Sequence, residues 1–197
     1  MTGVAALYID DRGPYPILLG SERCWGVTRD ARLYDGPWPV VAHPPCAPWT
    51  SLRTLCARDG EKALGLRAVE QVRAFGGVLE QPDRSLLWAA AGLPARGHSD
   101  GRGETFVVDQ VAWGHVARKR TWLYVVGVDR QIVASGIRTG GTVTHWCSGS
   151  HKPGDRGETP PGIKVCSAQQ RRRTPVAFAE WLIHLARRAQ TSVQTAG

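Results

Sequence analysis

Short apolar runs bounded by turn residues recur along this sequence, and they limit the folds open to it. Residues 4–9 and 37–42 each form such a run, which is short for a helix but typical of a buried strand. Residues 61–75 place their apolar side chains on one face of a helix, and residues 78–80 follow as another short strand. This alternation predicts an α/β fold with a mostly parallel sheet and flanking helices.

The rest of the chain is expected to continue this alternation. We predict a loop over 10–16, a short helix over 85–91, a polar loop over 96–104, strands over 106–113 and 121–126, loops over 134–166 and a last helix that begins at Thr174 and Pro175. Residues 1–133 are predicted to form a compact core, and residues 134–197 a loop-rich extension whose last helix packs on it. A chain of 197 residues suits one domain with a hydrophobic core.

Composition and charge exclude some classes of protein. Hydrophobic residues make up 42% of the chain and charged residues 21%, which is typical of a globular protein and not of a disordered one. No apolar run reaches the roughly 18 residues that span a bilayer, and the first residues lack the pattern of a signal peptide. We therefore expect a cytoplasmic protein without a membrane partner. The net charge of +8 favours a polyanionic partner such as nucleic acid, although a merely basic protein has the same composition.

One of the five cysteines stands in a distinctive setting. An odd number of irregularly spaced cysteines in a cytoplasmic protein indicates free thiols. Cys46 follows Pro44 and Pro45 at the end of a predicted strand, and two prolines fix the backbone that leads into it. A rigid loop that displays a thiol suits a nucleophile, because the geometry of attack is set in advance. The alternative, a small buried residue in a proline turn, is at least as compatible with this segment alone.

Two later segments extend the pattern around Cys46. The matching residues, in chain order, are Pro44-Pro45-Cys46, then Glu80 with Pro82, then Gly114-His115 with Lys119 and Thr121. In this order they resemble the cytosine carbon-5 DNA methyltransferases, especially the short forms seen in phage genomes. The resemblance runs from about Trp38 to Gly127, a little under half of the chain.

The resemblance implies a Rossmann-like, methyltransferase-type fold, DNA as partner and, for a phage protein, the cytoplasm of a bacterial host. In this family a thiolate adds to carbon-6 of cytosine, which is the role expected for Cys46. A carboxyl group binds the ring at nitrogen-3, which is expected of Glu80, although a pair with Arg84 is the alternative. Arg118 and Arg120 are expected to lower the pKa of the thiol and to hold a phosphate. The residues expected to contact DNA are Trp49, Thr50, His115, Lys119, Arg171 and Arg172.

The family uses S-adenosylmethionine, and here the pattern departs from it. The residues that we assign to the cofactor are Asp10, Asp11, Gly13, Asp30, His43 and Pro44. The first loop lacks a Gly-x-Gly turn, and Gln81 follows Glu80 where the family usually has Asn. Three interpretations stay open: a compact methyltransferase, a relative that deaminates or hypermodifies the base without S-adenosylmethionine, and an inactive nucleic-acid-binding relative. The oligomeric state is not predicted.

Two groups of residues have the side chains of a zinc site. They are His43, Cys46 and Cys56, and His145, Cys147 and His151. Neither group contains a paired Cys-x-x-Cys. We therefore predict no metal and treat Cys46 as a free thiol.

Overall fold

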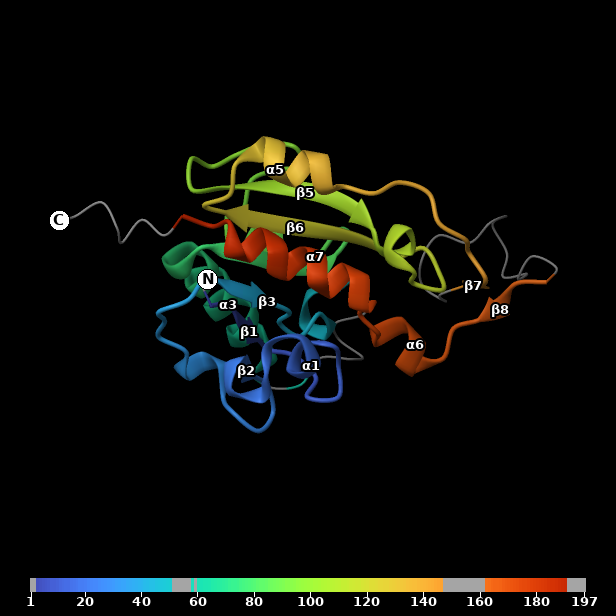
Figure 1. The fold of residues 1–197 in the computed structure, drawn as a ribbon, viewed down its shortest axis with the longest axis horizontal. Helices are drawn as coiled ribbons and strands as arrows, with labels where there is room; N and C mark the ends of the chain where they lie inside the picture. The colour runs from blue at the N-terminus through green and yellow to red at the C-terminus, as the bar shows by residue number, and fades with distance from the viewer. Residues whose placement is uncertain (1–2, 51–57, 59, 147–161, 191–197) are drawn as a thin grey trace.

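The computed structural model describes residues 3–50, 58, 60–146 and 162–190, and a single mixed sheet runs through its centre (Figure 1). The strands are β1 (Ala5–Leu7), β2 (Cys24–Trp25), β3 (Val40–Ala42), β4 (Gly77–Pro82), β5 (Gly103–Asp109) and β6 (Arg120–Val126), in the order β2-β1-β3-β4-β6-β5. The first four are parallel to one another, and β6 is antiparallel to both of its neighbours. The predicted α/β fold with a mostly parallel sheet is confirmed.

Helices and short turns connect these strands. The helices are α1 (Tyr15–Leu19), α3 (Glu61–Phe75), α4 (Leu87–Ala90), α5 (Arg130–Gly136), α6 (Ala168–Arg172) and α7 (Val176–Arg187). The 3-10 turns are η1 (Ser21–Arg23), η2 (Ala31–Leu33), η3 (Ala47–Trp49) and η4 (Gln110–Trp113), and β7 (His145–Trp146) pairs with β8 (Lys164–Val165) in a small ribbon. None of the helices in the described part of the chain is long and apolar enough to cross a bilayer.

The two faces of the sheet are covered by different helices. Side chains alternate between faces along a strand, so Val41 packs with α7 and α1, whereas its neighbours Val40 and Ala42 pack with α3. Leu182 of α7 and Val72 of α3 are both inaccessible to solvent. Because both faces are covered, the central strands are apolar throughout, which is why they were recognisable in the sequence.

Several predicted boundaries were wrong. The loop predicted over 10–16 ends early, because Tyr15 begins α1. The strand predicted over 106–113 lies at Gly103–Asp109 and takes in the end of the predicted polar loop. It stops because the Asp109 side chain accepts a hydrogen bond from the Val111 N–H and starts a 3-10 turn.

The C-terminal region holds more structure than the predicted loops. Helix α5 is capped by Asp129, whose side chain accepts from the Gln131 N–H, and it extends into the loop predicted from residue 134. Helix α6 begins with a capping box between Ser167 and Gln170. Helix α7 begins after Pro175, which is its N-cap, and not after Thr174 as predicted.

Candidate functional site

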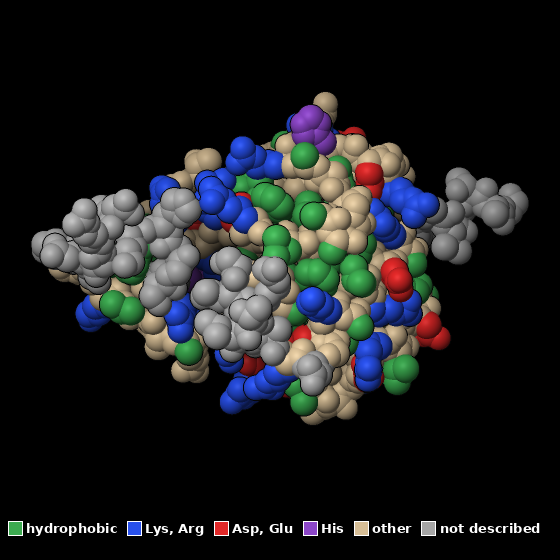
Figure 2. Space-filling model, turned by 180° about the vertical axis from the view of Figure 1, so that it is seen from behind, with side chains coloured by type: hydrophobic (Ala, Val, Ile, Leu, Met, Phe, Trp, Pro, Cys, Tyr) green, Lys and Arg blue, Asp and Glu red, His purple; other side chains and the backbone are tan. Residues whose placement is uncertain are grey.

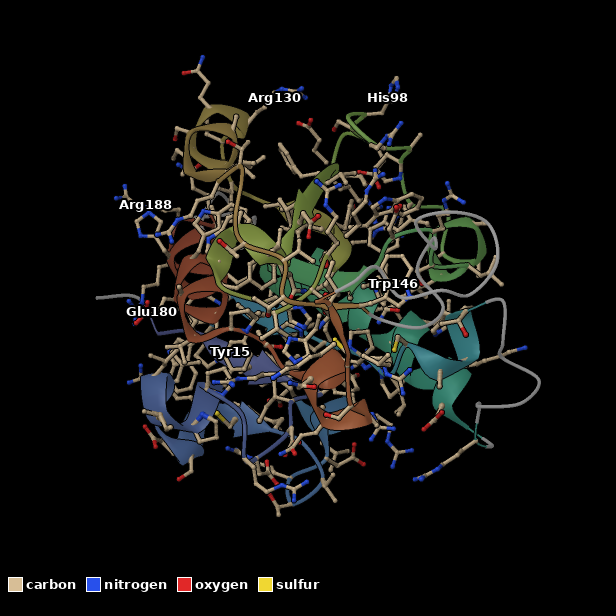
Figure 3. All side chains as sticks on the ribbon, turned by 90° about the vertical axis from the view of Figure 1, so that its right-hand side faces the viewer. Tyr15, His98, Arg130, Trp146, Glu180 and Arg188 are labelled. Atoms are coloured by element: carbon tan, nitrogen blue, oxygen red, sulfur yellow. The ribbon has the colours of Figure 1, made fainter. Side chains whose placement is uncertain are left out.

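The residues of interest meet at the carboxyl ends of the parallel strands. In the sheet, β1 lies between β2 and β3: the chain runs from β1 to its neighbour β2 on one side and then crosses to β3 on the other side. Such a reversal in strand order is a switch point, and ligands of open α/β sheets bind beside it. Figure 3 looks onto this end of the molecule, with Tyr15 labelled to the left of the centre.

Cys46 is presented at this edge by a short, rigid connection. The segment His43 to Pro45 follows β3 directly, and Cys46 is the N-cap of η3, whose Trp49 N–H donates to the Cys46 carbonyl at 3.0 Å. The Cys46 side chain is exposed. Behind it, Pro44 is buried, and its carbonyl oxygen accepts a hydrogen bond from the Gln81 side chain. Gln81 on β4 therefore fixes the loop that carries the thiol.

Glu80 lies on the neighbouring strand β4 and is only 8% exposed. One carboxylate oxygen is 2.9 Å from Nδ1 of His43, and the other accepts from the Gln110 amide at 3.0 Å. Its partners in the described structure are thus His43 and Gln110, and not Arg84. A buried carboxylate with both oxygens occupied is held in one orientation.

The neighbours of Glu80 keep it ionised. Burial acts to raise its pKa, but the hydrogen bond and charge of His43, together with the charge of Lys119, outweigh burial and lower the pKa below the ordinary value. Glu80 is therefore a hydrogen-bond acceptor at neutral pH. It can take up a proton during a reaction, but it does not hold one at rest.

Tyr15 completes a chain of hydrogen bonds through His43. Because ionised Glu80 can only accept, Nδ1 of His43 donates to it, and Nε2 of the same ring lies 2.6 Å from the Tyr15 hydroxyl, within hydrogen-bond distance. Burial, followed by the charge of Glu80, raises the pKa of Tyr15 well above its ordinary value, so the hydroxyl stays protonated. On the far side, Gln110 also donates to Thr121 at 3.0 Å. Tyr15, His43, Glu80 and Gln110 form one buried polar network.

Removing the Tyr15 hydroxyl tests this network. Tyr15→Phe leaves Nε2 of His43 without its hydrogen-bond partner, so we expect the free energy of unfolding to fall by about 1–2 kcal/mol in urea titrations. The His43 ring resonances should move in the NMR spectrum. Tyr8→Phe is the matched control, because it removes the hydrogen bond from Tyr8 to Gln71 and leaves His43 untouched. Unchanged His43 resonances in Tyr15→Phe would show that the two side chains are not bonded.

The thiol of Cys46 has a raised pKa, in contrast to the expectation of a lowered one. Desolvation by the surrounding protein and the charge of Glu80 raise it, whereas Lys119 and Arg172 act in the opposite direction. The cations named from the sequence are paired elsewhere, Arg118 with Asp109 at 3.8 Å and Arg120 with Asp83 at 3.3 Å. The resting protein therefore holds a thiol, and the thiolate has to form during the reaction.

This predicts the pH dependence of alkylation. The rate at which iodoacetamide modifies Cys46 should be low at neutral pH and rise as the pH passes the ordinary thiol value of 9.0. Peptide mass spectrometry identifies the modified cysteine, and Cys24 and Cys166, which are buried, serve as unreactive internal controls. A rate that is already at its plateau at neutral pH would contradict the raised pKa.

Basic side chains lie beside the thiol, on the turn before β6 and on α6. We call Lys119, Arg171 and Arg172 together the basic wall. His115 is 3% exposed, accepts from the Ala117 N–H and faces the Gln170 carbonyl at 3.1 Å. Lys119 donates to the Arg173 carbonyl. These contacts attach α6, which carries Arg171 and Arg172, to this end of the molecule. Figure 2 shows Lys and Arg side chains around this end, on the left of the view.

The other residues assigned to DNA contact have different positions. Trp49, which was expected to contact DNA, is 6% exposed and packs in the core against α3, a position that leaves its ring little surface for stacking on a base. The Thr50 hydroxyl donates to the Ala47 carbonyl at 3.3 Å, at the end of the turn that carries Cys46. His115 holds the basic wall in place from a buried position.

The residues assigned to a cofactor are mostly paired with close neighbours. Asp10 accepts from Arg12, Asp11 from Thr28, and Asp30 both caps η2 and pairs with Arg32 at 2.6 Å. The Gly13 N–H donates to the Asp10 carbonyl. His43 and Pro44 belong to the network around Glu80 and to the loop that carries the thiol.

No group of three metal-ligand side chains occurs among the described residues, and Cys56, Cys147 and His151 lie outside them. Tyr15 and Gln110 of the network, and Gln81, which holds the loop that carries Cys46, were not assigned to the site from the sequence. A glutamine that follows an apolar strand was the available signal for Gln81 and Gln110, and Tyr15 gave none. No family model, curated protein or solved structure matches the chain.

Proposed function

We propose that this protein modifies a pyrimidine base in DNA by covalent addition of Cys46, in the manner of the cytosine carbon-5 methyltransferases. One observation carries the proposal: an exposed thiol at the end of β3 lies beside a buried, ionised carboxylate on the adjacent strand β4. The net charge of +8 and the basic wall around Lys119 and Arg172 support DNA as the partner.

The protonation states give a balanced first step. The Cys46 sulfur forms a bond to carbon-6 of cytosine, and the electron pair of the 5,6 double bond moves toward carbon-5 and nitrogen-3. The proton that leaves the thiol passes to nitrogen-3, with the Glu80 carboxylate as the acceptor that carries it. Lys119 and Arg172 favour the transient thiolate. The product is a neutral enamine that is nucleophilic at carbon-5, with Glu80 ionised again.

The strand order supports a Rossmann-like fold for this chemistry. The usual doubly wound sheet has the order 3-2-1-4-5-6, and the parallel strands here correspond to its central 2-1-4-5 segment. The segment between β1 and β3 contains only short elements, α1, η1, β2 and η2, where a doubly wound fold usually has longer helices and a longer strand. A compact relative of the methyltransferase fold accounts for both features.

The segments that follow β1 and β2 do not fit S-adenosylmethionine well. A Cβ atom at Gly26 would lie 2.5 Å from the Ile9 carbonyl oxygen, and one at Gly13 would lie 3.0 Å from the Asp10 carbonyl oxygen, so protein backbone already occupies the space beside these glycines. The Tyr15 ring is 2% exposed at the same edge. We therefore derive no step through this cofactor.

This disagreement favours a second candidate, deamination without a cofactor. In the adduct with Cys46, protonation at carbon-5 leaves carbon-4 as an amidine that water can attack. Ammonia leaves from carbon-4, the proton at carbon-5 is lost, and the sulfur leaves from carbon-6. The net change is cytosine and water to uracil and ammonia.

Nucleoside mass spectrometry of DNA treated with purified protein separates these candidates. A methylated cytosine that requires S-adenosylmethionine identifies a methyltransferase, whereas deoxyuridine formed without it identifies a deaminase. Cells that express the protein provide DNA for detecting other adducts. If the protein binds DNA but leaves every nucleoside unchanged, the enzymatic proposal fails and the nucleic-acid-binding interpretation stands.

A further inference from the structure

A cavity of about 510 Å³ opens between α5 and α7, far from Cys46 along α7. Helix α7 begins beside the basic wall, because the Arg173 carbonyl just before the helix accepts a hydrogen bond from Lys119. At the other end of α7, the Gln190 N–H donates to the carbonyl of Gly127, which follows β6. Because β6 is antiparallel to β4, Gly127 lies at the opposite edge of the sheet from Cys46. The lining residues are Ile132, Ser135, Gly136, Ile137, Arg138, Trp181, His184 and Arg188.

Every ionisable side chain that lines this cavity is basic. Arg138, His184 and Arg188 face it, and no Asp or Glu belongs to the lining. Arg130 at the start of α5 pairs with Glu104, whereas Arg138 and Arg188 have no ion-pair partner in the described structure. Two guanidinium groups without an ion-pair partner beside one hollow create a positive potential that favours an anion. Figure 3 shows Arg188 on the outer side of α7.

The Trp181 ring forms part of the wall of the cavity. The indole nitrogen of Trp181 is buried without an acceptor in the described structure, and it lies against Gly136, where a side chain would collide with it. Trp181 is held rigidly, because it stacks on Trp113 with ring centroids 4.8 Å apart. The indole nitrogens of Trp49, Trp113 and Trp122 are likewise buried without an acceptor in the described structure, so Trp181 serves at this site as a rigid ring and as a spectroscopic reporter.

We propose that this cavity binds a phosphate group, carried either by a small phosphate-bearing molecule or by the backbone of a nucleic acid. Two guanidinium groups from different elements, Arg138 after α5 and Arg188 after α7, can bind phosphate oxygens from two sides. The volume lies within the range of roughly 300–1,000 Å³ that is usual for small-ligand sites. Ile132, Ile137 and the Trp181 ring provide apolar contact for the remainder of the ligand.

Titration with pyrophosphate and with a short DNA duplex tests the proposal on the whole chain. The readout is the indole N–H resonance of Trp181 in the NMR spectrum, assigned with Trp181→Phe. We expect it to move on binding, and we expect Arg138→Gln and Arg188→Gln each to weaken binding by about tenfold, because each removes a charged hydrogen bond. Arg187→Gln is the matched control, since Arg187 is exposed on α7 but does not line the cavity. Urea titration checks that each variant is folded.

The two ligands distinguish the source of the phosphate. Binding of pyrophosphate that depends on Arg188, with DNA affinity unchanged in Arg188→Gln, identifies a small ligand. A loss of DNA affinity together with a shallower salt dependence in Arg188→Gln, but not in Arg187→Gln, identifies the nucleic-acid backbone. If neither ligand moves the Trp181 resonance in the folded protein, or if all three arginine variants behave alike, the proposal is overturned. The cavity is remote from Cys46, so either result leaves the base-modification proposal to its own test.

Discussion

Cys46→Ala is expected to lower the rate of base modification by at least about 10⁴-fold, because no other side chain can take the place of the attacking sulfur. The fold should be unaffected, since the Cys46 side chain is exposed and makes no side-chain cap. DNA affinity should stay within about threefold of the parent, because the phosphate contacts of the basic wall remain. The rate is measured by nucleoside mass spectrometry and the affinity by titration of labelled duplex.

Two variants make this result specific. Cys46→Ser keeps the size of the side chain but offers a far weaker nucleophile, so it should be nearly as inactive as Cys46→Ala. Cys166→Ala removes a different, buried thiol and should keep the parent rate. If Cys46→Ala retained substantial activity, the sulfur would not be the nucleophile, whatever its position.

Glu80→Gln is expected to have the second largest effect. The amide keeps the shape of the side chain but removes the charge that accepts the thiol proton and orients His43. We expect the modification rate to fall by about 10²–10⁴-fold, the usual contribution of a general acid–base group. Near pH 7 the free energy of unfolding should fall by about 1–3 kcal/mol, because a buried bond to a charged group is lost.

The stability effect of Glu80 should depend on pH in a defined direction. Its pKa in the folded protein lies below the ordinary value of 4.5. The carboxylate therefore stabilises the fold fully above about pH 4.5, and this contribution is lost as the pH falls through the lowered folded-state pKa. The difference in unfolding free energy between the parent and Glu80→Gln should shrink between about pH 6 and about pH 3. A difference that stays constant over this range would show that the charge of Glu80 does not stabilise the fold.

The sequence predicted the central sheet because burial on both faces leaves a local signal. Val40 to Ala42 are apolar without a break, as strands between two helical layers must be. Helix α1 and strand β2 were not recognisable, because five and two residues are too few for a periodic pattern. Helix α5 depends on a cap at Asp129 and on packing against α7. Tertiary contacts determine such short elements.

The site was predictable only in part for a similar reason. The order of the motifs indicated that Cys46 and Glu80 belong together, but Tyr15 and Gln110 join them through contacts between distant parts of the chain. The basic residues next to β6 show a second limit. Successive side chains of an extended segment point in opposite directions, so Lys119 acts on the thiol, whereas Arg118 and Arg120 pair with aspartates.

Hydrogen exchange at carbon-5 of cytosine tests the covalent step most directly, because it requires only reversible addition of the thiol and no further reactant. DNA is incubated with the protein in heavy water, and its nucleosides are analysed by mass spectrometry. The account predicts deuterium at carbon-5 of cytosine with the parent protein, and none with Cys46→Ala. Binding of DNA by the parent protein without exchange at any pyrimidine would contradict the claim that Cys46 bonds to the base.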